Sequence, residues 1–176
     1  AVSRFSNPEA RKALEAWGVE TIACDLLDDA ALQALPDAPN VVYMAGMKFG
    51  STGNEALTWA MNVYLPGRVA EKYRGSRIAA FSTGNIYGLT PAVRGGSLET
   101  GALDPHGDYA QSCLGRERMF DHFSRTNGTP TTLIRLNYAC ELRYGVLVDL
   151  AKQVWAGDTV DLSMGCMNVI WQGDAN

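Results

Sequence analysis

The sequence predicts an α/β fold in which a doubly wound parallel sheet carries the helices. Short apolar runs alternate along the chain with longer amphipathic stretches, an order typical of successive β-α units. The run at residues 40–45 shows no polar alternation, which indicates a strand buried on both faces. Each amphipathic stretch lies between residues that typically begin a helix and residues that typically end one. We therefore expect the main strands to be parallel neighbours in one sheet.

The element boundaries follow from capping and helix-breaking residues. Asn7 and Pro8 begin the first helix and Gly18 ends it, while Pro36 stops the second. Pro66 predicts a kink or an early break in the third helix. The expected strands are residues 1–5, 19–23, 40–45, 77–82 and 131–136, with a short strand at 168–171. The expected helices are residues 9–17, 28–35, 54–73, 109–126 and 149–155.

One long loop interrupts this order. Residues 88–108 carry Gly, Pro and Thr without periodicity, and a loop of that length in a compact domain is usually functional. The helix that follows ends at Asn127-Gly128, a C-terminal stop signal. We expect the loop to border the functional site. No linker or internal repeat divides residues 1–176, so we predict one domain.

Composition excludes several classes of protein. The chain of 176 residues is 47% hydrophobic, which fits a globular domain with a core. Its net charge of −4 comes without a clustered basic stretch, so we expect a small-molecule partner rather than nucleic acid. Apolar runs such as residues 41–47 are too short to span a bilayer, and no leader opens the chain. We therefore expect a cytoplasmic protein that does not enter a membrane.

The cysteines are spaced too widely for a metal site or a disulfide framework. They are Cys24, Cys113, Cys140 and Cys166, with no C-x-x-C pair. Only His106 and His122 are available to join them as ligands. We expect free thiols and no bound metal.

The ends of two expected strands carry small and polar residues. Residues 42–48 read Val-Tyr-Met-Ala-Gly-Met-Lys, and residues 81–88 read Phe-Ser-Thr-Gly-Asn-Ile-Tyr-Gly. Tyr109 then heads the helix at residues 109–126. In this order and spacing the motifs resemble the extended short-chain dehydrogenases/reductases, and most closely the nucleotide-sugar epimerases of the NAD(P)-dependent epimerase/dehydratase family. The resemblance covers nearly the whole chain and implies a Rossmann domain that binds NAD or NADP.

The resemblance also implies roles for single residues. Thr83 and Tyr109 match the family's catalytic hydroxyl pair, and Cys113 stands where the family has its catalytic lysine. Arg4 ends the first expected strand, where a cation meets the 2′-phosphate of NADP, and therefore favours NADP over NAD. Further cofactor contacts are implied for Asp25, Leu26, Ala45, Gly46, Lys48 and Asn62, and substrate contacts for Asn85 and Asn137.

Each of these residues also has a purely structural interpretation. Thr83 alone is typical of a strand-end hydroxyl that satisfies the backbone, and Tyr109 of an aromatic ring packed on a helix. Asp25 fits a simple turn or cap. Lys48 and Arg116 fit solvated surface charges. The joint spacing of Thr83 and Tyr109 is what favours the catalytic interpretation.

Two departures from the family pattern have consequences. The glycine-rich turn after the family's first strand is absent, because the chain begins at what resembles the second strand. That turn brings a helix N-terminus to the cofactor pyrophosphate, so we expect residues 1–176 to be part of a longer protein.

The second departure is Cys113 in Tyr109-Ala-Gln-Ser-Cys113, where the family has lysine. The lysine charge lowers the pKa of the catalytic tyrosine, so its loss puts activity in doubt. Lys48 and Arg116 are two candidates for a replacement charge, and the sequence does not choose between them. We interpret Cys113 itself as a small apolar replacement rather than a nucleophile, because no histidine is near enough to activate it.

Two functions are compatible with this pattern. The first is an oxidoreductase, epimerase or dehydratase acting on a sugar-like or other hydroxylated substrate through Thr83 and Tyr109. The second is a catalytically weakened dinucleotide-binding sensor or structural protein. A third class, a flavodoxin-like or other nucleotide-binding α/β domain, would bind no nicotinamide cofactor. The resemblance suggests a homodimer through the helices that begin near Asn54 and Tyr109.

Overall fold

A computed structural model describes residues 1–48 and 50–175 of the chain. The strands are β1 (Val2–Ser3), β2 (Ile22–Ala23), β3 (Asn40–Tyr43), β4 (Arg77–Thr83), β5 (Thr131–Leu136), β6 (Tyr138–Cys140) and β7 (Val169–Trp171). The helices are α1 (Pro8–Ala16), α2 (Asp29–Gln33), α3 (Glu55–Trp59), α4 (Leu65–Lys72), α5 (Gly107–Asn127), α6 (Val146–Ala156) and α7 (Gln172–Ala175). Short helical turns are η1 (Ala60–Tyr64), η2 (Gly84–Ile86) and η3 (Ala92–Arg94).

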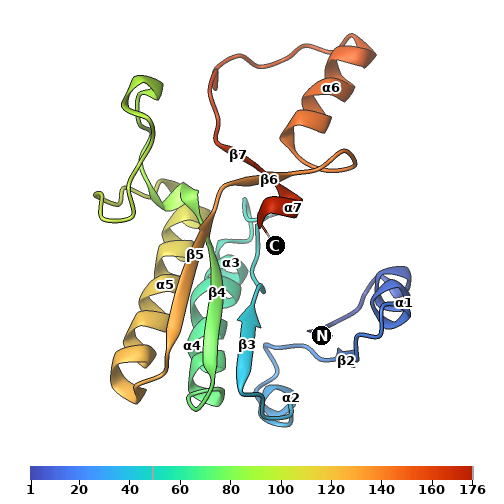
Figure 1. Cartoon of the computed structure of the whole chain (residues 1–176), viewed down its shortest axis with the longest axis vertical. Coiled ribbons are helices and arrows are strands. Elements are labelled where there is room, and N and C mark those ends of the chain that lie inside the picture. The colour runs from blue at the N-terminus through green and yellow to red at the C-terminus, as the bar shows by residue number, and fades with distance from the viewer. Residues whose placement is uncertain (49, 176) are drawn as a thin grey trace.

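All pairs of neighbouring strands in the three sheets are parallel, which confirms the α/β class. The central sheet has the order β3-β4-β5, with Tyr43 beside Ala80 and Thr83 beside Leu136. The expectation of one sheet is wrong, because β1 pairs with β2 in a separate sheet and Figure 1 shows this unit to one side of β3. In a doubly wound sheet the first strand joins the second to the fourth. The described residues hold no counterpart of that joining strand.

The helices cover one face of the central sheet. Figure 1 shows α4 and α5 side by side behind the strands, and α5 packs on β4 and β5. The expectation that the strand at residues 40–45 is buried on both faces is wrong, because Val42 is 63% exposed. The cause is that the helices contacting these strands lie on a single side, so alternate side chains face outward.

Pro66 changes the long helix without ending it. The helix runs from α3 through a π-helical turn, η1, into α4, and Pro66 lies buried in the first turn of α4. In a regular helix the ring of Pro66 would clash with the carbonyl of Asn62, four residues earlier. The chain instead widens, and the Leu65 N–H donates to the carbonyl of Ala60, five residues back. The predicted distortion therefore appears as a π turn centred on Asn62.

The first helix begins at the cap that the sequence predicts, and the second begins one residue after the predicted start at Asp28. Asn7 caps α1 by accepting hydrogen bonds from the N–H groups of Glu9 and Ala10, and Asp28 caps α2 in the same way. The described part of α1 buries no residue, whereas α2 places Leu32 in the core. The N-terminal unit is thus joined to the rest of the chain through α2.

The core lies between the central sheet and its helices. Tyr43 of β3 and Phe120 of α5 meet edge to face, with ring centroids 5.1 Å apart. Leu32, Leu65 and Phe120 are fully buried there. Among the described residues, no helix is both long and apolar enough to cross a membrane.

The C-terminal segment contains an element that the sequence did not reveal. This element is β6, which follows β5 almost directly. It pairs in parallel with β7, the short strand that the sequence predicted at residues 168–171. The helix between them, α6, projects away from the central sheet in Figure 1 and buries no residue. The expected loop at residues 88–108 is confirmed except for its short turn η3 and the start of α5. In Figure 1 it forms an arm beyond the end of β4.

Replacing Phe120 with alanine tests this description of the core. Phe120→Ala removes a fully buried ring and its contact with Tyr43, so the free energy of unfolding should fall by about 3–5 kcal/mol. Thr126→Ala, on the exposed part of the same helix, should change it by less than about 0.5 kcal/mol. Urea denaturation of the full-length protein measures both. Equal effects would show that Phe120 is not a core residue.

Candidate active site

The candidate site lies where β3 and β4 end. The two strands are parallel and adjacent, so the residues that follow them, Met44–Lys48 and Gly84–Tyr87, come out at the same edge of the sheet. Ligands of open α/β sheets bind at this carboxyl edge. The beginning of α5 brings Tyr109 to the same place, because α5 packs against β4 and η2. The structure thus brings together the main residues that the sequence singled out.

Thr83 and Tyr109 lie close enough at this edge for their hydroxyl groups to interact. Thr83, the last residue of β4, accepts a hydrogen bond from the N–H of Asn85 at 3.2 Å. Hydrogen bonding from its side chain also lowers the pKa of Tyr109. Burial acts more strongly in the opposite direction, and with Cys113 it raises the pKa of Tyr109 to about 12. The phenol is therefore neutral at physiological pH in this structure.

Cys113 lies one helical turn below Tyr109. Its side chain is fully buried, and burial raises the pKa of the thiol, with Arg116 opposing that rise. The thiol is therefore protonated near neutral pH, which agrees with the interpretation of Cys113 as a small replacement rather than a nucleophile.

The side-chain amide of Asn62 makes all of its hydrogen bonds to other residues of the protein. Its Oδ1 accepts from the Met47 N–H at 2.8 Å and from Arg116 Nη2 at 2.6 Å. Its Nδ2 donates to the Met47 carbonyl at 3.0 Å and to Ser112 Oγ at 3.0 Å. Asn62 is fully buried, so it lies below the site and fixes the backbone at Met47. The amide therefore has no donor or acceptor left for the direct cofactor contact that the resemblance implied.

Arg116 lies beneath the same segment. Besides Asn62 it donates from Nη1 to the carbonyl of Phe81 at 3.0 Å, so one guanidinium joins β4 to η1. The residue is only 8% exposed, which contradicts the interpretation as a solvated surface charge. Gly46 permits this arrangement, because a Cβ there would overlap the guanidinium and lie 2.9 Å from Asn62 Oδ1.

A second arginine anchors the loop after Thr83. Arg135 of β5 makes a bidentate ion pair with the buried Glu117, with N–O distances of 3.0 and 2.8 Å. Its Nη1 also donates to the Tyr87 hydroxyl at 2.6 Å and to the carbonyl of Glu99 at 3.1 Å. The bonds to Glu117 and Tyr87 raise the pKa of Arg135, the Glu117 bond most of all. The sequence missed Glu117, although it follows Cys113 by four residues and so lies on the same helix face.

The expected substrate residues lie at the same edge. Asn85 and Asn137 are both exposed, and they follow β4 and β5 directly. The Asn137 amide lies so close to Gly84 that a Cβ there would overlap it. Glycine at position 84 therefore lets the segments after the two strands approach each other.

The remaining expected cofactor residues are divided between two units. Ala45 and Lys48 follow β3 at the site, and the Lys48 ammonium lies 5.7 Å from the centroid of the Tyr138 ring. Arg4, Asp25 and Leu26 belong to the N-terminal unit, and Asp25 accepts a hydrogen bond from the Leu27 N–H at 3.0 Å, as a turn residue does. In the residues described, no group of three His, Cys, Asp or Glu side chains gathers to hold a metal ion.

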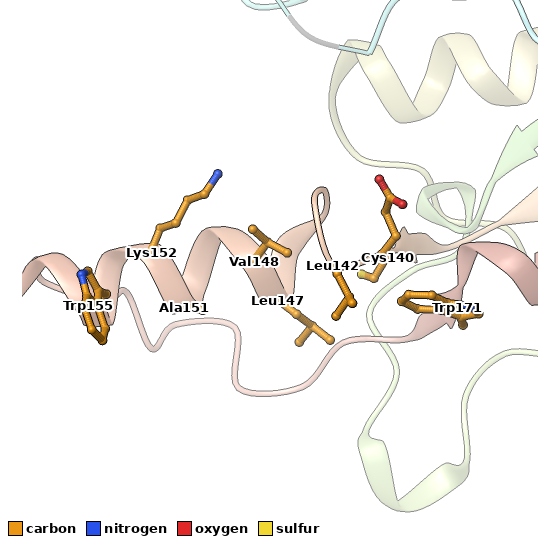
Figure 2. A pocket seen from close by; sticks show the side chains of 9 residues that line it. Cys140, Leu142, Leu147, Val148, Ala151, Lys152, Trp155 and Trp171 are labelled. Carbon is orange, nitrogen blue, oxygen red and sulfur yellow. The ribbon is translucent and has the colours of Figure 1, made fainter.

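A cavity lies elsewhere, between α6 and β6-β7. Figure 2 shows its apolar lining, which comes entirely from the C-terminal segment. The cavity measures about 570 Å³ and is lined by Cys140, Glu141, Leu142, Leu147, Val148, Ala151, Lys152, Trp155 and Trp171. Thr83 and Tyr109 do not line this cavity. The cavity therefore has no part in the catalytic roles suggested for them.

Comparisons with known proteins agree with the fold. The model of the NAD dependent epimerase/dehydratase family matches residues 1–140. A search of curated protein sequences found no match. Among solved structures, Pal from Bacillus thuringiensis is similar, with a TM-score of 0.81 and 15% identity over 99% of this chain and 62% of that one.

Two further structures illustrate the range of relatives. UDP-glucuronic acid 4-epimerase from Bacillus cereus, in complex with UDP-glucuronic acid and NAD, has a TM-score of 0.78 and 16% identity over 99% of this chain and 61% of its own. RMD from Pseudomonas aeruginosa, complexed with NADPH, has a TM-score of 0.62 and 18% identity over 76% of this chain and 51% of its own. The chain therefore spans less than two thirds of these proteins.

The packing of Arg116 under Gly46 can be tested by adding one methyl group. Gly46→Ala should displace the guanidinium or the 44–47 backbone and lower the free energy of unfolding by about 1–3 kcal/mol. Gly75→Ala is the matched control, because a Cβ at Gly75 meets no atom within 4 Å. Thermal and urea denaturation measure the difference. Two equally stable variants would contradict the close contact.

Proposed function

Because the chain belongs to the NAD dependent epimerase/dehydratase family, we propose that it forms part of an NAD(P)-dependent enzyme acting on a hydroxylated, sugar-like substrate. The reaction is an oxidation and reduction, an epimerisation or a dehydration that begins at a substrate hydroxyl. The proximity of Thr83 and Tyr109 at the carboxyl edge carries the proposal. It is also the geometry that the reaction needs, since one substrate oxygen must contact both hydroxyls.

The residues at the sheet edge suit a dinucleotide. Gly46 is exposed where β3 ends, so its backbone is accessible to a ligand. Arg4 is exposed after β1, where it can meet a phosphate, and this supports NADP over NAD. Relatives of this fold were crystallised with NAD and with NADPH. When bound, the nicotinamide ring supplies the acceptor and donor of hydride.

Tyr109 and Thr83 have complementary roles. Tyr109 Oη takes the proton from the substrate hydroxyl as the adjacent carbon loses hydride, and it returns the proton when the reaction reverses. Thr83 hydrogen-bonds the same substrate oxygen and holds it against Tyr109. Asn85 and Asn137, exposed beside the pair, donate and accept hydrogen bonds to the remaining substrate hydroxyls.

Residues 1–176 form part of the Rossmann domain of a cytoplasmic enzyme whose partner is a nucleotide-sugar-like small molecule. The enzyme is a homodimer through the helices that begin near Asn54 and Tyr109. Exposed aromatic side chains at Trp59 and Tyr64 support a contact on this side of the molecule.

A weakened dinucleotide-binding protein is the second candidate function. The buried thiol of Cys113 carries no charge at neutral pH, whereas a lysine there would hold a cation beside Tyr109. The pKa of Tyr109, about 12, also makes the phenolate scarce near neutrality. Both candidates bind cofactor, so turnover separates them.

We predict turnover with a steep dependence on pH. Since phenolate is the active form and the pKa of Tyr109 is about 12, its fraction rises about tenfold per pH unit below that value. The quantity to measure is kcat of the full-length protein with NAD or NADP and a panel of nucleotide sugars, from neutral to alkaline pH. Its logarithm should rise with a slope near one.

The residue assignment has its own controls. Tyr109→Phe should reduce kcat by about a hundredfold or more, and Thr83→Val should also reduce it strongly. Tyr144→Phe, at an exposed position outside the site, should leave kcat unchanged. Cofactor binding without turnover would favour the second candidate, and absence of nicotinamide binding would exclude both.

A further inference from the structure

Three residues of α5 form a row below the candidate site. Tyr109, Cys113 and Arg116 follow one another at spacings of four and three, so they lie on one face of the helix. The position nearest the tyrosine holds the uncharged Cys113. The next position on the same face holds a guanidinium, and Arg116 is buried there rather than extended into solvent.

Arg116 is held as an unneutralised cation. Its hydrogen bonds go to two neutral oxygens, of Asn62 and of the Phe81 carbonyl, and its Nε has no hydrogen-bond partner among the described residues. The adjacent carboxylate of Glu117 pairs with Arg135 instead. Burying a charge without a counter-ion costs stability, and an apolar residue would avoid that cost. Such costly charges concentrate at functional sites.

We propose that Arg116 provides the positive charge of this site in place of a lysine at position 113, acting as a positioning residue for Tyr109 and for the backbone at Met47. The inference rests on the proposed function, because it gives Tyr109 the role of base. The geometry supports both parts. The guanidinium shares its helix face with Tyr109, and through Asn62 Oδ1 it is connected to the Met47 N–H.

The charges around Arg116 agree with this role. Arg116 lowers the pKa of Tyr109 and Cys113 on its own helix and of Tyr43 on β3. From the other elements packed around it come the neutral Asn62 of η1 and the Phe81 carbonyl of β4. Glu117, which raises the pKa of Cys113, is the nearby carboxylate and is paired with Arg135. Lys48, the other candidate cation, is exposed and lies over the Tyr138 ring.

The test measures the ionisation of Tyr109 directly, in the full-length protein without substrate. Tyrosine is replaced biosynthetically by 3,5-difluorotyrosine, whose phenol ionises at lower pH, and ¹⁹F NMR follows each ring as the pH rises. Loss of one signal in Tyr109→Phe assigns the resonance. Arg116→Met removes the charge, Arg116→Gln keeps a hydrogen-bonding group, and Arg116→Lys keeps the charge. Arg118→Met removes an exposed arginine from the same helix as a control.

We expect Arg116→Met and Arg116→Gln to raise the pKa of residue 109 by about one unit, a tenfold loss of phenolate. Arg116→Lys should retain most of the native value, and Arg118→Met should not change it. In turnover assays the neutral variants should lower kcat about tenfold at a given pH below the pKa, with little change in KM.

Two results would overturn the inference. One is a titration of residue 109 that is unchanged in a folded neutral variant. The other is failure of both neutral variants to fold while Arg116→Lys folds with an altered titration, which would make Arg116 purely structural. Loss of the proposed function is a separate outcome, since a protein without nicotinamide turnover would still show the titration shift.

Discussion

The site depends on the requirement that the buried amide of Asn62 be fully hydrogen-bonded. Each of its two donors and two acceptor positions meets a partner, and these partners come from the segment after β3 and from α5. An unsatisfied amide in this place would cost about 1–3 kcal/mol. Satisfying it fixes Met47, Ser112 and Arg116 relative to one another, and with them the edge of the sheet where Thr83 and Tyr109 meet.

Several local irregularities have the same origin. The π turn at Ala60–Tyr64 is centred on Asn62, and Pro66 four residues later prevents the regular hydrogen bond to its carbonyl. Gly46 leaves the space that the guanidinium fills. A side chain at position 46 or a regular helix at residues 60–64 would move the amide away from Met47. The departures from regular structure are therefore grouped around one contact rather than scattered along the chain.

The sequence predicted the elements well and their long-range contacts poorly. The cap at Asn7, the start of a helix near Asp28 and the strand Thr131–Leu136 follow from local signals, because capping and burial patterns act over a few residues. The split between the β1-β2 unit and the central sheet is a matter of tertiary arrangement, which local signals do not determine. The network of Asn62 joins residues about fifty positions apart, and no local pattern encodes such contacts.

Arg116 and Arg135 show why position rather than residue type decides what a charge does. Arg135 lies against Glu117, so its charge is neutralised and its remaining donors hold Tyr87 and the loop at Glu99. Arg116 is the helix neighbour of the same carboxylate but makes no ion pair with it, so its charge remains effective in the low-dielectric interior. Arg135 binds both oxygens of Glu117, and Arg116 acts instead on the phenol and the thiol above it. The ion pair anchors the loop, while the neighbouring cation stays unneutralised.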